Sequence, residues 1–496
     1  MPSSSPQYHI LPRTSTDSLS PDEFKDKPLR RPRNSYLRTV RRACRLCLRP
    51  IYLLPLLTIF LLWQLLLNAS YTSPPPFTVP AHERVYIAAN IIDGDLITGA
   101  WGRSLLQLVD LIGKERVFVS IYGGPTQALE QLGGMLECEH ALVSESENPL
   151  DMASLPRTKL PTGESRVKRI AYLAEVRNKA LIPLQTGKAG DFDKVLFIND
   201  VYFDAADATR LIWGTNVDEK TGNAMYKAAC GADFVGWWKM YDTFATRDAE
   251  GYSIGVPIFP WFAGEGDAIS RNDVLAGKDA VRVKSCWGGI TAFDARYLQP
   301  QISSPNLPLK FRSEPEPFWD SSECCLIHAD IMALPSFPTS PAIWDELNGY
   351  DKGIYMNPHV RVSYDAGTQS RLHFARRVER LFSPIQRLAN WLAKMPVFNA
   401  RRTEIEGEII EDKVWVSSMA PPPTSRSAHA KRATIKGTPR MDDAYWHAKG
   451  HYVTANRTAT RGAYCGVRQL LVVKEVVGEG EGNWDNLMYE VPPLGL

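Results

Sequence analysis

The sequence predicts an α/β protein with a central, mostly parallel sheet that helices cover on both faces. Three short apolar runs have the composition of buried strands: Val85–Ala89, Arg116–Tyr122 and Lys194–Ile198. Stretches with apolar residues at helical spacing lie between them, at Leu105–Ile112 and Arg169–Leu184. Strands that alternate with helices are typical of parallel sheets. Because ligands of such sheets bind beyond the carboxyl ends of the strands, we expect the functional residues there.

The remaining elements follow from turn signals and composition. The first strand ends at Asn90, and residues 123–125 (Gly-Gly-Pro) terminate the second strand. A helix at Gln127–Leu136 and a strand at His140–Ser144 come next. From the changes in composition we expect a disordered basic tail at 1–50, an apolar segment at 51–67, a stem at 68–81, a main domain at 82–400, a low-complexity linker at 401–440 and a C-terminal segment at 441–496 that packs on the main domain.

The charge is unevenly distributed along the chain. The 57 Lys and Arg and 55 Asp and Glu give a net charge of +2. Residues 1–50 hold 11 basic and 4 acidic residues, so the other 446 residues carry a net charge of −5. A nucleic-acid-binding protein needs a basic face, so this balance argues against that class. The apolar fraction of 44% argues against a wholly disordered chain.

The uncharged segment 51–67 follows a cluster of arginines. This arrangement predicts a single transmembrane signal anchor, with the tail in the cytosol and the rest of the chain in the lumen of the secretory pathway. A buried core helix and a cleaved signal peptide are the alternatives. Six cysteines follow the segment, which permits up to three disulfides in an oxidising compartment. The sequon at Asn456 fits the same compartment.

Polar residues at the end of the third strong strand are the first candidate site. Asn199 and Asp200 follow Lys194–Ile198 directly. A carboxylate in this position can hold a divalent cation that bridges a diphosphate, although a turn or helix cap has the same appearance. Arg177 and Asn178 come from the preceding helix and could contact anionic oxygens. A solvated helix face is the alternative for these two residues.

Two later segments combine aromatic residues with charges or glycines. Residues 241–248 include Asp242, Arg247 and Asp248, a mixture that suits a sugar site or a loop fixed by a salt bridge. The run Trp287-Gly288-Gly289 would let the backbone approach a ligand closely.

A third segment, 318–330, places two carboxylates and a histidine near a tryptophan. These are Asp320, Glu323 and His328. The alternative is a capped helix with Glu323 in its first turn and His328 as a core residue.

Taken in order, these segments resemble a fungal α-1,3-mannosyltransferase family of the cryptococcal capsule-associated type. The matching segments are RIAYLAEVRNKAL (169–181), FDKVLFINDVYF (192–203), YDTFATRD (241–248), VKSCWGGITAFDA (283–295), SSECCLIHADI (321–331) and NPHVRVSYD (357–365). The resemblance implies a type II Golgi membrane enzyme with a GT-A-like nucleotide-sugar-binding fold. It implies GDP-mannose as donor, a mannose-containing glycan as acceptor, retention of configuration, and a divalent cation, Mn²⁺ or Mg²⁺.

The resemblance implies a metal-binding role for Asp200 and acceptor-side roles for Trp287, Gly288, Gly289 and Glu323, and our hypothesis for the reaction gives the other candidate residues their roles. The catalytic set is Glu323, Asp320 and Asp242; the donor-binding set is Asn90, Arg177, Asn178, Asn199 and Asp200; the acceptor or sugar-binding set is Arg247, Asp248, Trp287, Gly288 and Gly289; the metal ligands are Asp200 and His328.

The sequence departs from the family pattern at Asp200, which lies in Asn-Asp-Val and not in Asp-x-Asp, and in the loops 91–95 and 123–125. Two alternatives therefore stay open: another hexosyl- or xylosyltransferase of the same fold, and a non-catalytic glycan-binding relative.

Overall fold

The structure is a computed structural model that describes residues 50–160, 164–302, 304–334, 349–417, 450–474, 477 and 481–487. The expected tail, apart from residue 50, and residues 418–440 of the expected linker lie outside these ranges. The chain divides into two compact units, residues 1–62 and 63–496.

The apolar segment forms one helix, α2 (Pro50–Leu66), of 17 residues. Among the described residues, none of the helices combines the length and the apolar character that crossing a membrane requires. The prediction of a transmembrane helix at 51–67 is therefore not supported.

A nine-stranded mixed sheet forms the centre of the second unit, in the order β3-β2-β1-β6-β10-β7-β12-β9-β8. Its first half is parallel and consists of β1 (Val85–Ala89), β2 (Val117–Gly123), β3 (Glu139–Ser144) and β6 (Lys194–Ile198). These four strands match the three predicted from apolar runs and the strand predicted at His140–Ser144. The order 3-2-1-4 of these strands is the order found in doubly wound nucleotide-binding sheets.

The second half of the sheet contains strands of both directions. Its members are β7 (Ala228–Phe234), β8 (Arg247–Asp248), β9 (Val281–Ser285), β10 (Ile290–Asp294) and β12 (Ile354–Ser363). Strand β10 pairs antiparallel with both β6 and β7, whereas β12 is parallel to β7. The α/β class and the mostly parallel sheet are thus confirmed, with β9 and β10 running against the rest.

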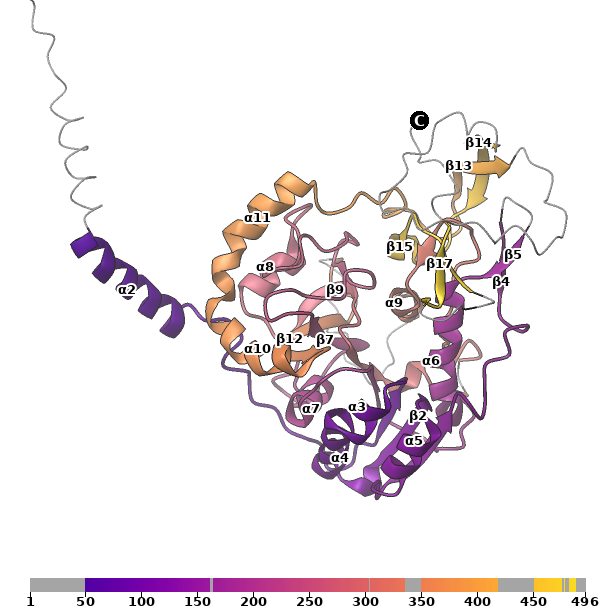
Figure 1. The fold of residues 1–496 in the computed structure, drawn as a ribbon, viewed down its shortest axis with the longest axis horizontal. Helices are drawn as coiled ribbons and strands as arrows, with labels where there is room; N and C mark the ends of the chain where they lie inside the picture. Colours follow the sequence, from indigo (N-terminus) through magenta and orange to yellow (C-terminus); the bar gives the residue numbers. More distant parts are fainter. Residues whose placement is uncertain are drawn as a thin grey trace, which may run out of the picture. The chain divides into compact units, whose positions relative to one another are not determined.

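Helices cover both faces because successive side chains of a strand point to opposite sides. Tyr86 and Ala88 of β1 belong to one core, and Val85, Ile87 and Ala89 belong to the other. The first core includes residues of α6 (Arg169–Gln185) and α9 (Glu323–Ala333), and the second includes residues of α4 (Ala100–Ile112), α5 (Thr126–Gly133) and α7 (Ala205–Trp213). Figure 1 shows α4 and α5 grouped with the short helix α3 (Gly94–Thr98). The remaining helices are α8 (Ile269–Leu275), α10 (Ala366–Val378) and α11 (Phe382–Ala393).

The described residues also form four two-stranded sheets: β4 (Arg157–Lys159) with β5 (Ser165–Val167), β11 (Asp320–Ser321) with β15 (Gly466–Val467), β13 (Ile409–Ser417) with β14 (Gly450–Thr458), and β16 (Leu471–Val473) with β17 (Trp484–Asn486). The boundary of the expected linker at 401 is corrected, because residues 409–417 form a strand that pairs along its whole length with β14. The C-terminal segment lies beside α6 and α9 (Figure 1), where β15 pairs with β11.

The structure pairs four of the six cysteines that follow α2. Cys230 bonds to Cys286, and Cys325 bonds to Cys465. Cys138 and Cys324 are free thiols inside the protein. The second disulfide ties α9 to the C-terminal segment across 140 positions of the chain.

Candidate active site

The candidate site lies at the carboxyl edge of the sheet, where β1 and β6 are neighbours. The strand that follows β1 in the chain, β2, lies on one side of it, and β6 lies on the other. Such a change of direction opens a crevice at the carboxyl ends, and ligands of α/β sheets bind there. Asn90 follows β1 at this edge, and Asn199 and Asp200 follow β6.

Arg177 of α6 connects the groups around this crevice. Its Nε donates to Oε1 of Glu323 at 3.0 Å, and its Nη1 donates to Oδ1 of Asn199 at 3.2 Å. The guanidinium lies 4.4 Å from the ring centroid of Trp287, which is in turn packed against Phe197. A guanidinium held by a carboxylate and an aromatic face is pre-organised for anionic oxygens, because little rotamer freedom is left to lose.

Asp200 projects from the end of β6 and is accessible to solvent. The protein atoms around its carboxylate raise the pKa of Asp200 by desolvation, Arg177 opposes this shift, and the carboxylate of Asp93 adds to it. Asp93 is the N-cap of α3 and accepts a hydrogen bond from the Leu96 N–H at 3.0 Å.

Oxygen ligands of this kind fit Mn²⁺ or Mg²⁺. Mg²⁺ is usually held by one or two carboxylates together with substrate phosphates and water. Asp200 and Asp93 could supply the carboxylates, and a diphosphate could supply further oxygens. Among the described residues, no group of three His, Cys, Asp or Glu side chains has the arrangement of a metal site made by protein alone.

Asn90 has one polar atom without a partner. Its Nδ2 donates to the carbonyls of Tyr122 and Val176, at 3.1 and 2.9 Å. Its Oδ1 is buried and accepts no hydrogen bond from the protein. A buried acceptor without a donor costs free energy, so this oxygen is suited to receive an N–H or O–H from a ligand.

The segment Trp287-Gly288-Gly289 is fixed by Asp242. Oδ2 of Asp242 accepts from the Trp287 N–H at 3.1 Å and from the Gly288 N–H at 3.4 Å. Gly288 has φ of +55°, and a Cβ there would lie 2.0 Å from the carbonyl oxygen of Gly231. The expectation that the glycines admit a ligand is therefore corrected, because Gly288 admits the neighbouring strand β7 and Gly289 admits the side chains of Val201 and Val362. The Trp287 ring faces Arg177 and is buried.

Asp233 and Tyr364 join the site without having been predicted. Oδ2 of Asp233 accepts from the Tyr364 hydroxyl at 2.9 Å, and its Oδ1 accepts from the Asp242 N–H at 3.0 Å. Burial, together with the charge of Asp242, raises the pKa of Asp233 to about 7. A carboxylate inside the otherwise apolar run AACGADF was the available signal in the sequence. The exposed ring of Tyr241 lies 4.6 Å from that of Tyr364 and offers an apolar face beside the site.

Two predicted residues are structural. Asp320 is fully buried, pairs with Lys168 Nζ at 2.8 Å and accepts from the Leu471 N–H at 3.0 Å, so the assignment of Asp320 as catalytic is corrected. Asn178 forms two hydrogen bonds with the backbone of Phe311, both at 2.9 Å. Because these bonds occupy its amide, its assignment to donor binding is corrected as well.

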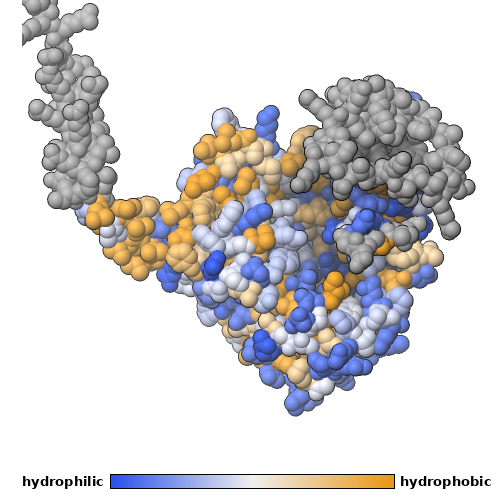
Figure 2. Space-filling view, viewed as in Figure 1, coloured by the Kyte–Doolittle hydropathy of each residue, from blue (hydrophilic) through white to orange (hydrophobic). Residues whose placement is uncertain are grey.

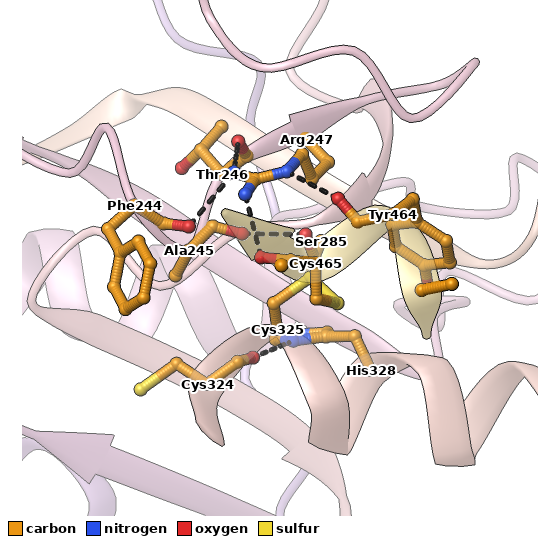
Figure 3. Close-up of a disulfide and its surroundings, with 12 residues drawn as sticks. Phe244, Ala245, Thr246, Arg247, Ser285, Cys324, Cys325, His328, Tyr464 and Cys465 are labelled. Carbon is orange, nitrogen blue, oxygen red and sulfur yellow. Dashed lines mark hydrogen bonds between the residues drawn. A yellow bond between two sulfur atoms is a disulfide. The ribbon is translucent and has the colours of Figure 1, made fainter. Parts of the chain in front are cut away.

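Arg247 and Asp248 are also structural. Arg247 donates from Nε to the Tyr464 carbonyl at 2.8 Å and from Nη2 to the Cys465 carbonyl at 2.7 Å (Figure 3). Asp248 accepts from two backbone N–H groups of its own turn, those of Glu250 and Tyr252. Both side chains are buried, and these bonds hold them in the protein, so the assignment of Arg247 and Asp248 to sugar binding is corrected.

His328 lies in the core and not in a metal shell. Its Nδ1 lies 2.6 Å from the carbonyl oxygen of Cys324 on the same helix (Figure 3), and its ring packs 5.6 Å from that of Phe293. Burial lowers the pKa of His328 to about 4. The alternative of a core histidine therefore describes this residue, and the prediction of a metal ligand is corrected.

Comparison with known proteins identifies relatives of this chain. The family model described as Cryptococcal mannosyltransferase 1 matches residues 84–330. Alpha-1,3-mannosyltransferase CMT1 of Cryptococcus neoformans var. neoformans serotype D (strain JEC21 / ATCC MYA-565) is 28% identical over 253 residues. The match covers 46% of this chain and 49% of the relative, so the chain spans about half the length of the curated relative it matches.

Two solved structures show a weaker likeness. Glucosyl-3-phosphoglycerate synthase from Mycobacterium tuberculosis, in complex with Mn²⁺, uridine diphosphate and phosphoglyceric acid, is 14% identical with a TM-score of 0.30, covering 68% of this chain and 89% of that one. Mannosyltransferase PcManGT from Pyrobaculum calidifontis, in complex with GDP-Man and Mn²⁺, is 13% identical with a TM-score of 0.30, covering 69% and 75%. These scores are too low to bear on the ligands of this chain. The match over residues 84–330, which contains Asn90, Arg177, Asp200 and Glu323, shows that this part of the chain is similar to the cryptococcal-type mannosyltransferase family.

Proposed function

We propose that the protein is a GT-A-type glycosyltransferase that transfers mannose from GDP-mannose to a mannose hydroxyl of a glycan, forming an α-1,3 linkage with retention of configuration. Similarity to the cryptococcal-type mannosyltransferase family supports mannosyl transfer. The single observation that carries the proposal is the position of Arg177, between Glu323 and Asn199 at the carboxyl edge of β6. A guanidinium at this edge is suited to the diphosphate of a nucleotide sugar.

The residues of the site divide the work of binding and reaction. Asn90, at the end of β1, would accept a hydrogen bond from the nucleotide sugar at its unpaired Oδ1. Arg177 would bind the diphosphate. Asp200 and Asp93 would hold a divalent cation, Mn²⁺ or Mg²⁺. When bound, the cation would supply positive charge against the departing diphosphate. Glu323 would keep Arg177 oriented and stabilise the positive charge that develops at the sugar.

The reaction breaks the bond between C1 of the donor sugar and the diphosphate, and forms a bond from C1 to the acceptor oxygen. The acceptor's hydroxyl proton leaves with the GDP. Tyr241 would stack against the apolar face of a sugar, since its ring is exposed beside Tyr364. Asp242 would act indirectly, because its oxygens hold the backbone of Trp287 and Gly288.

The test is an assay of the full chain with GDP-mannose, an α-linked mannobiose and Mn²⁺. We expect GDP release that depends on the acceptor. Turnover of UDP-glucose or UDP-xylose in place of GDP-mannose would assign the chain to another hexosyl- or xylosyltransferase. Calorimetry that detects glycan binding without donor binding would identify a non-catalytic relative.

We also propose that the domain works in an oxidising compartment of the secretory pathway, such as the Golgi. Its two disulfides support this location, because such bonds persist in oxidising compartments. Asn456 is exposed on β14 and begins the sequon Asn-Arg-Thr. We expect endoglycosidase treatment to change the electrophoretic mobility of the wild-type chain and to leave that of Asn456→Gln unchanged. An unmodified Asn456 in chain isolated from its native cell would count against the location.

A further inference from the structure

Helix α11 has its polar and apolar faces reversed relative to an ordinary surface helix. Its buried residues are Gln386 and Asn390, which are polar and lie four positions apart. Its apolar residues point outward, with Ile385 55%, Leu388 57%, Trp391 75% and Leu392 67% exposed. A surface helix in water normally turns its apolar stripe toward the core.

The inward face is fixed by hydrogen bonds. Gln386 Nε2 donates to the Trp261 carbonyl at 3.0 Å, and Gln386 Oε1 accepts from Arg271. Oδ1 of Asn390 accepts from the Val256 N–H at 2.6 Å. Rotation of the helix to bury its apolar stripe would break these bonds and leave buried polar groups unpaired. The outward position of Leu388 and Trp391 is therefore built into the fold.

The apolar stripe belongs to a larger surface. Val397 and Phe398, just after the helix, are also exposed, as is Leu67 at the other end of this region. Gln64 Nε2 donates to the Arg377 carbonyl at 2.9 Å, which places residues 64–67 against the end of α10. Figure 2 shows hydrophobic residues gathered over the part of the surface that α11 occupies in Figure 1.

The charge of this region is positive. Residues 366–398 contain five Arg and one Lys against one Glu, a net charge of +5. The one acidic side chain, Glu379, is buried and pairs with Arg361 at 2.7 Å. The exposed charges of this segment are thus basic, among them Arg371, Arg387 and Lys394.

We propose that α11 lies in the surface of a lipid bilayer that contains anionic lipids. A helix with Trp and Leu on one face, flanked by basic residues, matches the pattern of interfacial helices. Trp391 has the amphipathic ring that favours the headgroup level, and the basic side chains complement anionic headgroups. The helix would lie parallel to the membrane plane, so the proposal is independent of the length of α2 and of the enzymatic function.

The experiment places an environment-sensitive fluorophore on the helix in the full chain. Leu388→Cys carries the probe, in a background with Cys44→Ser and Cys47→Ser. Because Cys138 and Cys324 are buried and the other four cysteines are disulfide-bonded, a folded variant takes up one label. Leu111→Cys is the matched control, since Leu111 is 55% exposed on α4.

We expect vesicles of phosphatidylcholine with phosphatidylserine to shift the emission at position 388 to the blue, and to leave position 111 unchanged. The double variant Arg387→Gln, Lys394→Gln should bind these vesicles with an affinity that is lower by a factor of about five for each charge removed. Three results would overturn the proposal: no shift at position 388, an equal shift at position 111, or a shift that appears without vesicles as protein concentration rises. The last result would identify a second copy of the chain as the occupant. An unchanged response in the doubly neutralised variant would overturn the preference for anionic lipid.

Discussion

The Nε of Arg177 donates to Oε1 of Glu323 at 3.0 Å, which joins helix α6 to the first turn of α9 across 146 positions of the chain. Both side chains are largely buried. The same guanidinium reaches Asn199 at the end of β6 and stacks on Trp287. One cation thus links the β1–β6 edge of the sheet to the second half of the domain.

Arg177→Lys should lower the turnover number by about 10²–10³-fold, the usual cost of removing one preorganised charge-stabilising group. Lysine keeps the charge but loses the planar fork that contacts Glu323 and Asn199 together. The matched control is Arg103→Lys on α4, which should retain wild-type turnover. Turnover of the Arg177→Lys variant within twofold of the wild type would refute the central role of this residue.

Asp200→Asn should abolish the increase in melting temperature that GDP with Mn²⁺ gives the wild type. A ligand that binds the native state raises the apparent stability, and the loss of one carboxylate weakens the cation site. Asp93→Asn should reduce the increase, because Asp93 acts on Asp200 electrostatically. Asp95→Asn, two positions away in α3, is the control and should respond like the wild type. A wild-type increase in melting temperature in Asp200→Asn would refute the assignment of Asp200 as a metal ligand.

Asp320→Asn should destabilise the fold by about 3–5 kcal/mol, because it leaves the buried ammonium of Lys168 without its anionic partner. Denaturant unfolding measures this change. Lys168→Met combined with Asp320→Leu should cost less than the sum of the single changes. Turnover per folded molecule should stay near the wild-type value in every case. A loss of turnover at an unchanged folded fraction would restore Asp320 to the catalytic set.

Asp233 should make stability dependent on pH in a defined window. Its pKa is about 7 in the native state against 3.8 in the unfolded chain, so the native state binds more protons between these values. The stability that this group contributes is fully present below pH 3.8 and is lost as pH rises through 7. As pH rises across this window, the free energy of unfolding of the wild type should therefore fall relative to that of Asp233→Asn, by at most about 1.4 kcal/mol per pH unit. Parallel stability profiles of the two proteins would contradict the prediction.

Local pattern was sufficient for the parallel half of the sheet. The strands β1, β2 and β6 coincide with apolar runs, because a strand buried on both faces must be apolar at every position. The positions of Asn90 and Asp200 follow from this, since a residue just after a parallel strand lies at the ligand-binding edge. Arg177 could be predicted as a candidate site residue from its place on the helix before β6. The positions of these three residues thus depend on the first, parallel half of the sheet and its helices.

The roles of the later charged residues were decided by tertiary structure. Arg247 is occupied by the carbonyls of residues 464 and 465, and Asp320 by Lys168 and Leu471, all more than 100 positions away. A charged side chain can serve a ligand only when its hydrogen-bonding groups are not already used by the protein. Sequence shows which residues carry charge, and the docking of the C-terminal segment determines which of them remain available. The same holds for α11, whose apolar stripe faces outward because the hydrogen bonds of Gln386 and Asn390 fix the opposite face.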